Sequence, residues 1–235
     1  MQQGYQTKQE SIAVSGVANV RICSLLDRNQ FSDPLGHAER LGISSAMWPI
    51  FGLLWPSGTR LAERMALRPV VQGERILEIG CGLALASIVA HRAGANITAS
   101  DCHPLAARFL RNNLRLNHML PMPYLHGQWG AVVPNKPSPS ALGAAPLPLA
   151  LYNLVIGSDV LYERDSKGDL AQFVGTRCSP VAQVWIVDPD RSNRRAFSTR
   201  MLALGFLLRE ERLDSAAAQD KPAYKGRLLC YSRSG

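Results

Sequence analysis

Two acids and two glycines in this chain have the types and spacing of a ligand-binding turn. The stretch RILEIGCGLALAS runs from an apolar strand pattern through Gly80 and Gly82 into a helix pattern, with leucine where a dinucleotide turn has its third glycine. Glu78, just before the first glycine, would repel a diphosphate and favours a ligand that carries positive charge. Asp101 closes the next predicted strand, where a carboxylate can accept both hydroxyls of a ribose.

S-adenosylmethionine fits these preferences, because it combines an adenosine with a sulfonium and an ammonium and has no phosphate. Gly80 and Gly82 alone also fit a plain tight turn with a helix-capping acid. The carboxylate before them and the one that ends the next strand favour a nucleoside site. The sequence therefore predicts that Glu78, Gly80, Gly82 and Asp101 bind S-adenosylmethionine.

A second pair of residues, Asp159 and Tyr162, stands at the end of the apolar run LYNLVIGSDVLY. Open α/β sheets place their chemistry just past the carboxyl ends of central strands, so we expect these side chains to orient a methyl acceptor. For a lysine acceptor, desolvation would lower the pKa of the amine and its proton would leave to water without a strong general base. The structural alternative is that Asp159 caps the following helix and Tyr162 packs against that helix.

The elements that position these residues alternate from about Leu61 onward, which predicts a doubly wound sheet. The predicted strands are ERILEIG, NITASD, PYLHGQW, LYNLVIGSDVLY and AQVWIVDP, and the predicted helices are LAERMALRP, LALASIVAHRAG and PLAARFLRNNLRLN. The last two strands are nearly continuous apolar runs, as expected of strands that are covered on both faces. The final runs GFLLREERLD and GRLLCYSR leave no room for a crossover helix between them, which predicts an antiparallel pair.

Several motifs resemble one known family. LEIGCGLALASI…ITASD resembles the cofactor half of class I S-adenosylmethionine-dependent methyltransferases, and SDVLY resembles the D-x-x-Y signature of the seven-strand protein-lysine methyltransferases. LWPSGTRLA resembles the tryptophan-containing segment of the same family, and VDPDR is similar to its branch that modifies the electron-transfer flavoprotein β subunit. The resemblance covers roughly residues 47 to 235. It implies that Trp55 lies by the methionine moiety, that Trp129 packs near the adenine and that Ser158 also contacts the cofactor.

The predicted fold class is therefore α/β, a Rossmann-like doubly wound sheet of seven strands, mostly parallel with a C-terminal antiparallel hairpin. A chain of 235 residues with 46% hydrophobic content suits a single globular unit. Within it we expect an N-terminal extension and cofactor-covering segment over residues 1–60 and a methyltransferase domain over residues 61–235. The Pro/Ala-rich stretch 134–150 is predicted to be a flexible surface insertion.

Three further groups of residues each allow a functional and a structural interpretation. The aromatic segment MWPIFGLLW would form either an exposed partner patch or a lid over the core. Asp188 and Asp190 would bind a cation or simply flank a turn at Pro189. The arginine groups bind a partner or are solvated; they are Arg108, Arg111 and Arg115, and Arg191, Arg194, Arg195 and Arg200.

The formal charge of +8 favours an acidic partner, either a protein surface or RNA. The five cysteines contain no C-x-x-C pair, so we expect neither a disulfide framework nor a metal site. No targeting or membrane-spanning segment is expected, because the longest apolar run, AMWPIFGLLW, is too short and contains a proline. These features together predict a cytoplasmic protein.

The function expected from the motifs and the resemblance is an S-adenosylmethionine-dependent N-methyltransferase that acts on a protein lysine, with Asp159 and Tyr162 as the catalytic residues and S-adenosylhomocysteine as the second product. Two alternatives stay open. The first keeps the cofactor and changes the acceptor to a small molecule or an RNA base, although the loop after the fourth strand lacks the Asn/Asp-Pro-Pro-aromatic sequence of many base N-methyltransferases. The second is a module that binds the cofactor without catalysis.

Overall fold

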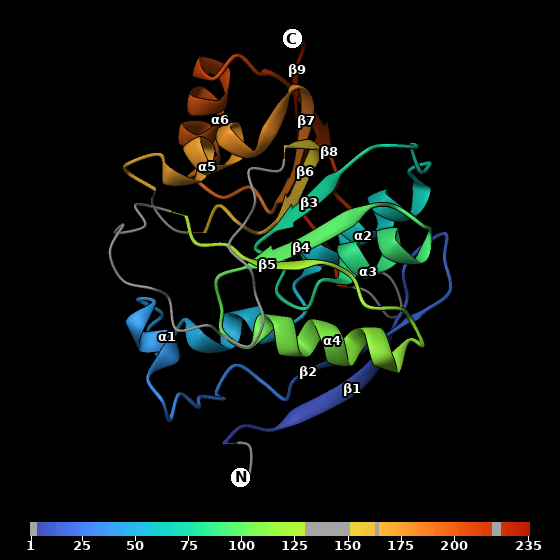
Figure 1. The fold of residues 1–235 in the computed structure, drawn as a ribbon, viewed down its shortest axis with the longest axis vertical. Coiled ribbons are helices and arrows are strands. Elements are labelled where there is room, and N and C mark those ends of the chain that lie inside the picture. Colours follow the sequence, from blue (N-terminus) through green and yellow to red (C-terminus); the bar gives the residue numbers. More distant parts are fainter. Residues whose placement is uncertain (1–3, 130–150, 163–164, 218–221) are drawn as a thin grey trace.

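The computed structural model describes residues 4–129, 151–162, 165–217 and 222–235, and the predicted insertion at 134–150 lies outside these ranges. Its main feature is a seven-stranded sheet (Figure 1). In sheet order the strands are β5 (Tyr124–His126), β4 (Ile97–Asp101), β3 (Ile76–Ile79), β6 (Tyr152–Ser158), β7 (Cys178–Asp188), β9 (Arg227–Arg233) and β8 (Leu207–Arg212). Strands β5, β4, β3, β6 and β7 pair in parallel, and β9 is antiparallel to both β7 and β8. The predicted mostly parallel sheet with a C-terminal antiparallel pair is confirmed.

Helices cover both faces of the sheet. One layer consists of α2 (Pro56–Leu67), α3 (Leu85–Arg92) and α4 (Ala106–Leu116), and the other of α5 (Asp169–Arg177) and α6 (Arg194–Ala203). Successive residues of the central strands face opposite layers: Leu154 and Ile156 belong to the first core, whereas Val155 belongs to the second. The apolar runs of these strands are explained by this two-sided burial.

The N-terminal part forms a small separate sheet, as the predicted strand and loop extension requires. Strands β1 (Thr7–Ile12) and β2 (Val20–Leu25) pair antiparallel and lie along α4, where the backbone N–H of Cys23 donates to Asn113 Oδ1 at 2.8 Å. A short helix α1 (His37–Arg40) and a 3-10 helix η1 (Trp48–Gly52) then lead to α2. None of the described helices is both long and apolar enough to cross a membrane.

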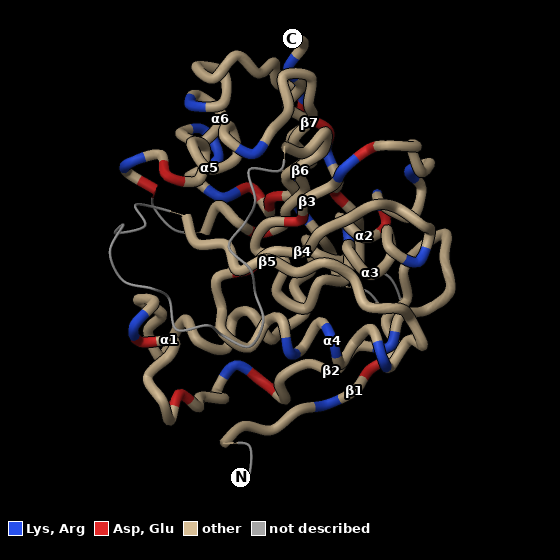
Figure 2. Tube along the Cα trace, in the orientation of Figure 1, with Lys and Arg blue, Asp and Glu red and all other residues tan. Residues whose placement is uncertain are grey.

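Basic residues are distributed in two different ways (Figure 2). Arg108, Arg111 and Arg115 are exposed on one face of α4, which agrees with a solvated helix face. Around β7, α6 and the final hairpin, by contrast, basic and acidic residues alternate in space and form ion pairs. The second arginine group is therefore built into the fold, and interpreting it as a merely solvated loop was wrong for most of its members.

Candidate active site

The glycine turn after β3 brings the backbone close to two other segments. Gly80 and Gly82 have φ values of 56° and 51°, in the left-handed region that favours glycine. A Cβ on Gly82 would lie 2.9 Å from the carbonyl oxygen of Phe51, and one on Gly80 would lie 2.8 Å from Val160 Cγ1 and 3.4 Å from the ring of Trp129. Both the conformation and the space therefore require glycine at these positions.

Glu78 is buried at the end of β3 and joins this strand to the helix that follows the turn. Its Oε2 accepts hydrogen bonds from the backbone N–H of Ser87, at 2.9 Å, and from the Ser87 hydroxyl. Burial raises the pKa of Glu78 to about 7, although the Ser87 hydrogen bonds act in the opposite direction. A cation bound nearby would therefore favour loss of the proton from this carboxyl group.

Asp101 ends β4 and binds the glycine turn from the side opposite Glu78. Its Oδ2 accepts from the N–H of Gly82 and its Oδ1 from the N–H of His103, both at 2.8 Å. Burial raises the pKa of Asp101, and these backbone donors oppose that shift. The two predicted carboxylates therefore lie on adjacent parallel strands at the carboxyl edge of the sheet.

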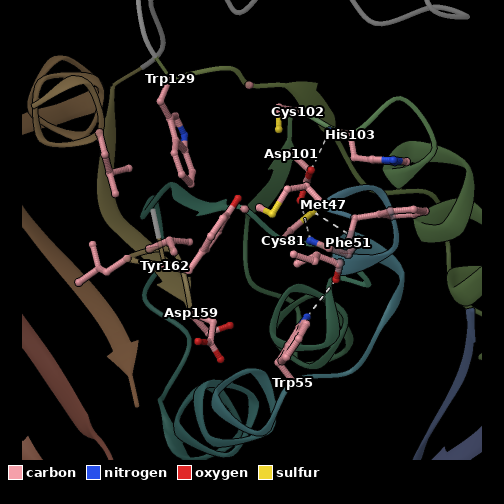
Figure 3. Close-up of a pocket in the computed structure, with 18 of the residues that line it drawn as sticks. Met47, Phe51, Trp55, Cys81, Asp101, Cys102, His103, Trp129, Asp159 and Tyr162 are labelled. Atoms are coloured by element: carbon pink, nitrogen blue, oxygen red, sulfur yellow. Dashed lines mark hydrogen bonds between the residues drawn. The ribbon is translucent and has the colours of Figure 1, made fainter. Parts of the chain in front are cut away.

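Aromatic side chains form the walls of the site (Figure 3). Trp129 stands over Gly80, and Trp55, whose Nε1 donates to the carbonyl of Ile50 at 2.9 Å, lies on the opposite side of the pocket. Trp48 and Phe51 are 1% and 6% exposed and pack edge to face against each other. Their burial confirms that the MWPIFGLLW segment covers the core and is not an exposed patch.

The residues predicted to orient the methyl acceptor, Asp159 and Tyr162, follow β6. Ser158 ends this strand, and Asp159 turns the chain with a left-handed φ of 57° while its N–H donates to the carbonyl of Val187 at 2.9 Å. Tyr162 is 40% exposed and projects into the pocket between Asp159 and Trp129 (Figure 3). The alternative that Asp159 caps the next helix is wrong, since Asp165 accepts the first backbone donors of α5.

The loop between β7 and α6 contributes a residue that the sequence analysis did not place in the site. Arg191 lines the pocket and donates through Nε to Asp159 Oδ1 at 3.0 Å and through Nη2 to the same oxygen. The only sequence indication was the VDPDR motif, whose arginine stands two residues past a proline turn. Asp190 in this motif pairs with arginines and Asp188 binds the N–H of Arg191, so the structural interpretation of both acids is confirmed.

These residues share one pocket of about 1230 Å³, which exceeds the usual range of roughly 300–1,000 Å³ for a single small ligand. All of the predicted site residues line it; they are Trp55, Glu78, Gly80, Gly82, Asp101, Trp129, Ser158, Asp159 and Tyr162. The pocket wall also includes five acids, whereas its only arginines among the described residues are Arg191 and Arg200. Both arginines lie at the Asp159 end, so the glycine-turn end is purely acidic.

Four of the described non-glycine residues have a positive φ, and three of them surround this pocket. Ala84 and Asp159 line it, and Asp190 belongs to the loop that carries Arg191. Backbone conformations of this kind cluster at functional sites, where the surrounding structure holds them in place. No group of three or more possible metal ligands occurs within the described ranges.

Comparisons with known proteins agree with this geometry. No protein-family model matches the chain. It is 29% identical over 148 residues to the electron transfer flavoprotein beta subunit lysine methyltransferase of Danio rerio, an alignment that covers 61% of this chain and 51% of that protein. It is also 29% identical over 145 residues to the histone-arginine methyltransferase METTL23 of Xenopus laevis, with 59% and 57% covered. The chain thus spans about half the length of the curated relatives it matches.

Among solved structures, a 16S rRNA methyltransferase of T. thermophilus in complex with AdoMet and guanosine superposes with a TM-score of 0.58. The match covers 99% of this chain and 51% of that one, at 14% sequence identity. A likeness at this level of identity shows the fold alone. The chain has the Rossmann-like fold of class I S-adenosylmethionine-dependent methyltransferases, as the sequence analysis predicted.

Proposed function

We propose that this protein is an S-adenosylmethionine-dependent N-methyltransferase that modifies a lysine side chain of a protein. The observation that carries the proposal is the joining of two different sites in one pocket. An acidic, glycine-lined end suits a cationic nucleoside, and a polar end with Asp159 and Tyr162 suits an amine. The similarity to lysine and arginine methyltransferases of proteins supports a protein acceptor.

The residues at the acidic end fit the cofactor. The wall near the glycine turn holds Glu78 and Asp101 and, among the described residues, no lysine or arginine, so it disfavours phosphate and favours the ammonium and sulfonium. We assign Gly80, Gly82 and the edge of Glu78 to the methionine part and Asp101 to the ribose hydroxyls. Trp129 would pack against the adenine and Trp55 against the methionine part, with Ser158 as a further contact.

The aromatic cover over this end supports the proposed division of the chain. Met47, Phe51 and Trp55 line the pocket from the segment before Leu61, while the glycine turn and the strand ends line it from the rest. We therefore propose that residues 1–60 form an extension that covers the cofactor and that residues 61–235 form the methyltransferase domain.

At the acceptor end the chain must bind and deprotonate an amine. When bound, the cofactor supplies a methyl carbon, which the nitrogen lone pair attacks while the carbon–sulfur bond breaks and its electron pair stays on sulfur. A free lysine amine has a pKa near 10.4, so having it neutral at pH 7 costs roughly 4 to 5 kcal/mol. Asp159 and the Tyr162 hydroxyl orient the amine, burial in the pocket lowers its pKa, and the proton leaves to water. Orientation can contribute about 7 kcal/mol or more, so no strong general base is needed.

All five cysteines are free thiols, and Cys23, Cys81 and Cys178 are buried. Unpaired cysteines are typical of a reducing compartment. We therefore propose that the protein works in the cytoplasm, on a protein substrate whose docking surface is acidic enough to suit a chain with a formal charge of +8.

The test is transfer of labelled methyl from S-adenosylmethionine into an extract of the source cell, divided afterwards between protease and nuclease. We expect label that only protease removes, and acid hydrolysis of the labelled fraction should yield methyl-lysine. Binding of S-adenosylhomocysteine is measured beside it by calorimetry. Label that only nuclease removes would show that the acceptor is RNA. Label recovered as methyl-arginine would show that the acceptor residue is arginine. Binding of the ligand without any transfer would indicate a module without catalysis.

A further inference from the structure

Arg191 places a positive charge at the end of the pocket that is proposed to bind an amine. Its guanidinium binds Asp159 Oδ1 through Nε and Nη2, and among the described residues no hydrogen bond reaches Oδ2. The Asp159 side chain is 13% exposed and that of Arg191 is 36% exposed, so the pair sits at the pocket wall and is only partly screened by solvent. One oxygen is thus held by the arginine, and the other stays available to an acceptor amine.

The loop that carries Arg191 is fixed from two sides. Asp188 Oδ1 accepts the backbone N–H of Arg191 at 2.7 Å. Asp190, with a left-handed φ of 62°, accepts from Arg194, Arg212 and Arg227, each at 2.8 Å. These bonds tie the loop to α6 and to the final hairpin, so the position of the guanidinium is set by the fold and not by a free surface loop.

An unpaired carboxylate beside the acceptor would work against methyl transfer. A negative charge within about 4–6 Å of an amine raises the pKa of the amine by roughly 1 to 3 units, which makes the neutral nucleophile about 10 to 1,000 times rarer. Asp159 is needed to orient the amine, yet its charge alone would hold the amine as an ammonium. A guanidinium on the same carboxylate removes most of this effect and leaves an oxygen that still accepts a hydrogen bond.

We propose that Arg191 is a charge-balancing residue: by pairing with Asp159 it offsets the negative charge of that carboxylate at the methyl-transfer position, so that the acceptor enters it as a neutral amine. This inference rests on the proposed function and adds the protonation state in which the site accepts its substrate. It also assigns Asp190 and its three arginines a positioning role, because they hold the loop that presents Arg191.

Other titratable and charged groups line the same pocket or interact electrostatically with the pair; they are Tyr162 after β6, Asp165 and Asp169 at the start of α5, Asp188 at the end of β7, Arg194 and Arg200 on α6, and Tyr224 between β8 and β9. Asp165 lies 3.8 Å from Arg200, and Asp190 pairs with Arg194, so among the described residues the acids of this group that are left without an ion pair to an arginine are Asp169 and Asp188. Burial raises the pKa of Asp188 to about 6 and the charge of Arg191 opposes this shift, so in the wild type Asp188 is charged above pH 7. Removing Arg191 takes away the positive charge that pairs with Asp159 and also lets the pKa of Asp188 rise.

The first test uses two ligands that need no known substrate. Sinefungin carries an amine where the cofactor carries its methyl sulfonium, and S-adenosylhomocysteine carries no charge there. At pH 7.5 we measure the affinity of each ligand by calorimetry for the wild type, Arg191→Gln and Arg191→Lys. We expect Arg191→Gln to strengthen sinefungin relative to S-adenosylhomocysteine by about tenfold, because the unbalanced Asp159 then favours the ammonium. Arg191→Lys should stay near the wild-type ratio.

The matched control is Arg195→Gln, which removes an exposed arginine from α6, the helix that follows the loop of Arg191, and should leave the ratio within about twofold of wild type. Asp159→Asn should move the ratio in the opposite direction, so the proposal can still be tested if Arg191→Gln does not fold. An unchanged ratio in Arg191→Gln, or a weaker sinefungin, would overturn the charge-balancing role. Failure of the wild type to bind either ligand would instead overturn the proposed function.

The second test is the pH dependence of methyl transfer into protein of the cell extract between pH 6.5 and 10. Arg191→Gln should shift the rise of the rate to higher pH by about one unit or more, whereas Arg191→Lys should restore the wild-type profile. A lower rate with an unshifted profile would show that Arg191 only shapes the loop. A higher rate at neutral pH would show that it blocks Asp159 and must move away.

Discussion

The two ends of the pocket are built in different ways. At the proposed cofactor end the glycine turn and the two carboxylates come from one contiguous stretch and the neighbouring strand, and these carboxylates, Glu78 and Asp101, are buried and bonded to backbone N–H groups. The acceptor end joins Asp159 to Arg191, which lies on another loop 32 residues later, and the two are partly exposed. In the function proposed above, the first end would bind a ligand through preformed geometry, whereas the second would control charge through a pair that can be altered without disrupting the fold.

The largest effect is expected where only the acceptor end is changed. Asp159→Asn should lower the rate of methyl transfer by about 100-fold or more, because the amine loses the carboxylate that orients it. Asparagine adopts the left-handed φ of 57° more readily than alanine does, so the backbone should remain in place. The measurement is labelled transfer together with calorimetry of S-adenosylhomocysteine, whose affinity should change less than threefold. A large loss of affinity would assign Asp159 to the structure of the cofactor end.

A substitution in the glycine turn should weaken binding at the proposed cofactor end most directly. In Gly82→Ala the new methyl group would lie 2.9 Å from the Phe51 carbonyl oxygen, so we expect S-adenosylhomocysteine to bind about 30-fold more weakly and the melting temperature to fall. Gly94→Ala is the control, since Gly94 also has a positive φ but no atom lies within 4 Å of its added Cβ. If both variants lose the same affinity, backbone strain alone is responsible and the close approach to Phe51 is not.

A smaller effect is expected in the pH dependence of ligand affinity at the glycine-turn end of the pocket. Burial raises the pKa of free Glu78 to about 7, and a bound ammonium favours its ionised form. Affinity for S-adenosylhomocysteine should therefore rise as pH increases through 7, by about tenfold between pH 6 and pH 8, and then level off. Glu78→Gln should bind more weakly and lose this dependence. A wild type whose affinity is flat across this range would show that Glu78 is already ionised in the free protein.

The sequence alone predicts the glycine-turn end of the pocket better than the end that holds Asp159 and Arg191. Gly80, Gly82, Glu78 and the following helix are neighbours in sequence, and local periodicity with strand-end chemistry sufficed to place them in one site. Arg191 could not be placed, because an arginine after a proline turn has the same local pattern whether it is solvated or paired. Its partner is fixed only by the register of β6 against β7, which no local pattern encodes.

The smallest expected effect concerns the carboxyl group beneath the acceptor loop. Asp188 is buried, and burial raises its pKa to about 6, so the folded protein holds this proton more tightly than the unfolded chain does. This group therefore lowers the stability of the wild type as pH rises from about 4 to about 6. In Asp188→Asn the side-chain oxygen can still accept a hydrogen bond from the N–H of Arg191. The amide does not titrate, so the melting temperature of this variant should rise relative to that of the wild type between about pH 4 and pH 6. Thermal melts from pH 4 to 7.5 check it, with Asp169→Asn, at the half-buried start of α5, as the control. A difference that stays constant with pH would mean that folding does not raise the pKa of Asp188 and that this carboxylate keeps its charge across the whole interval.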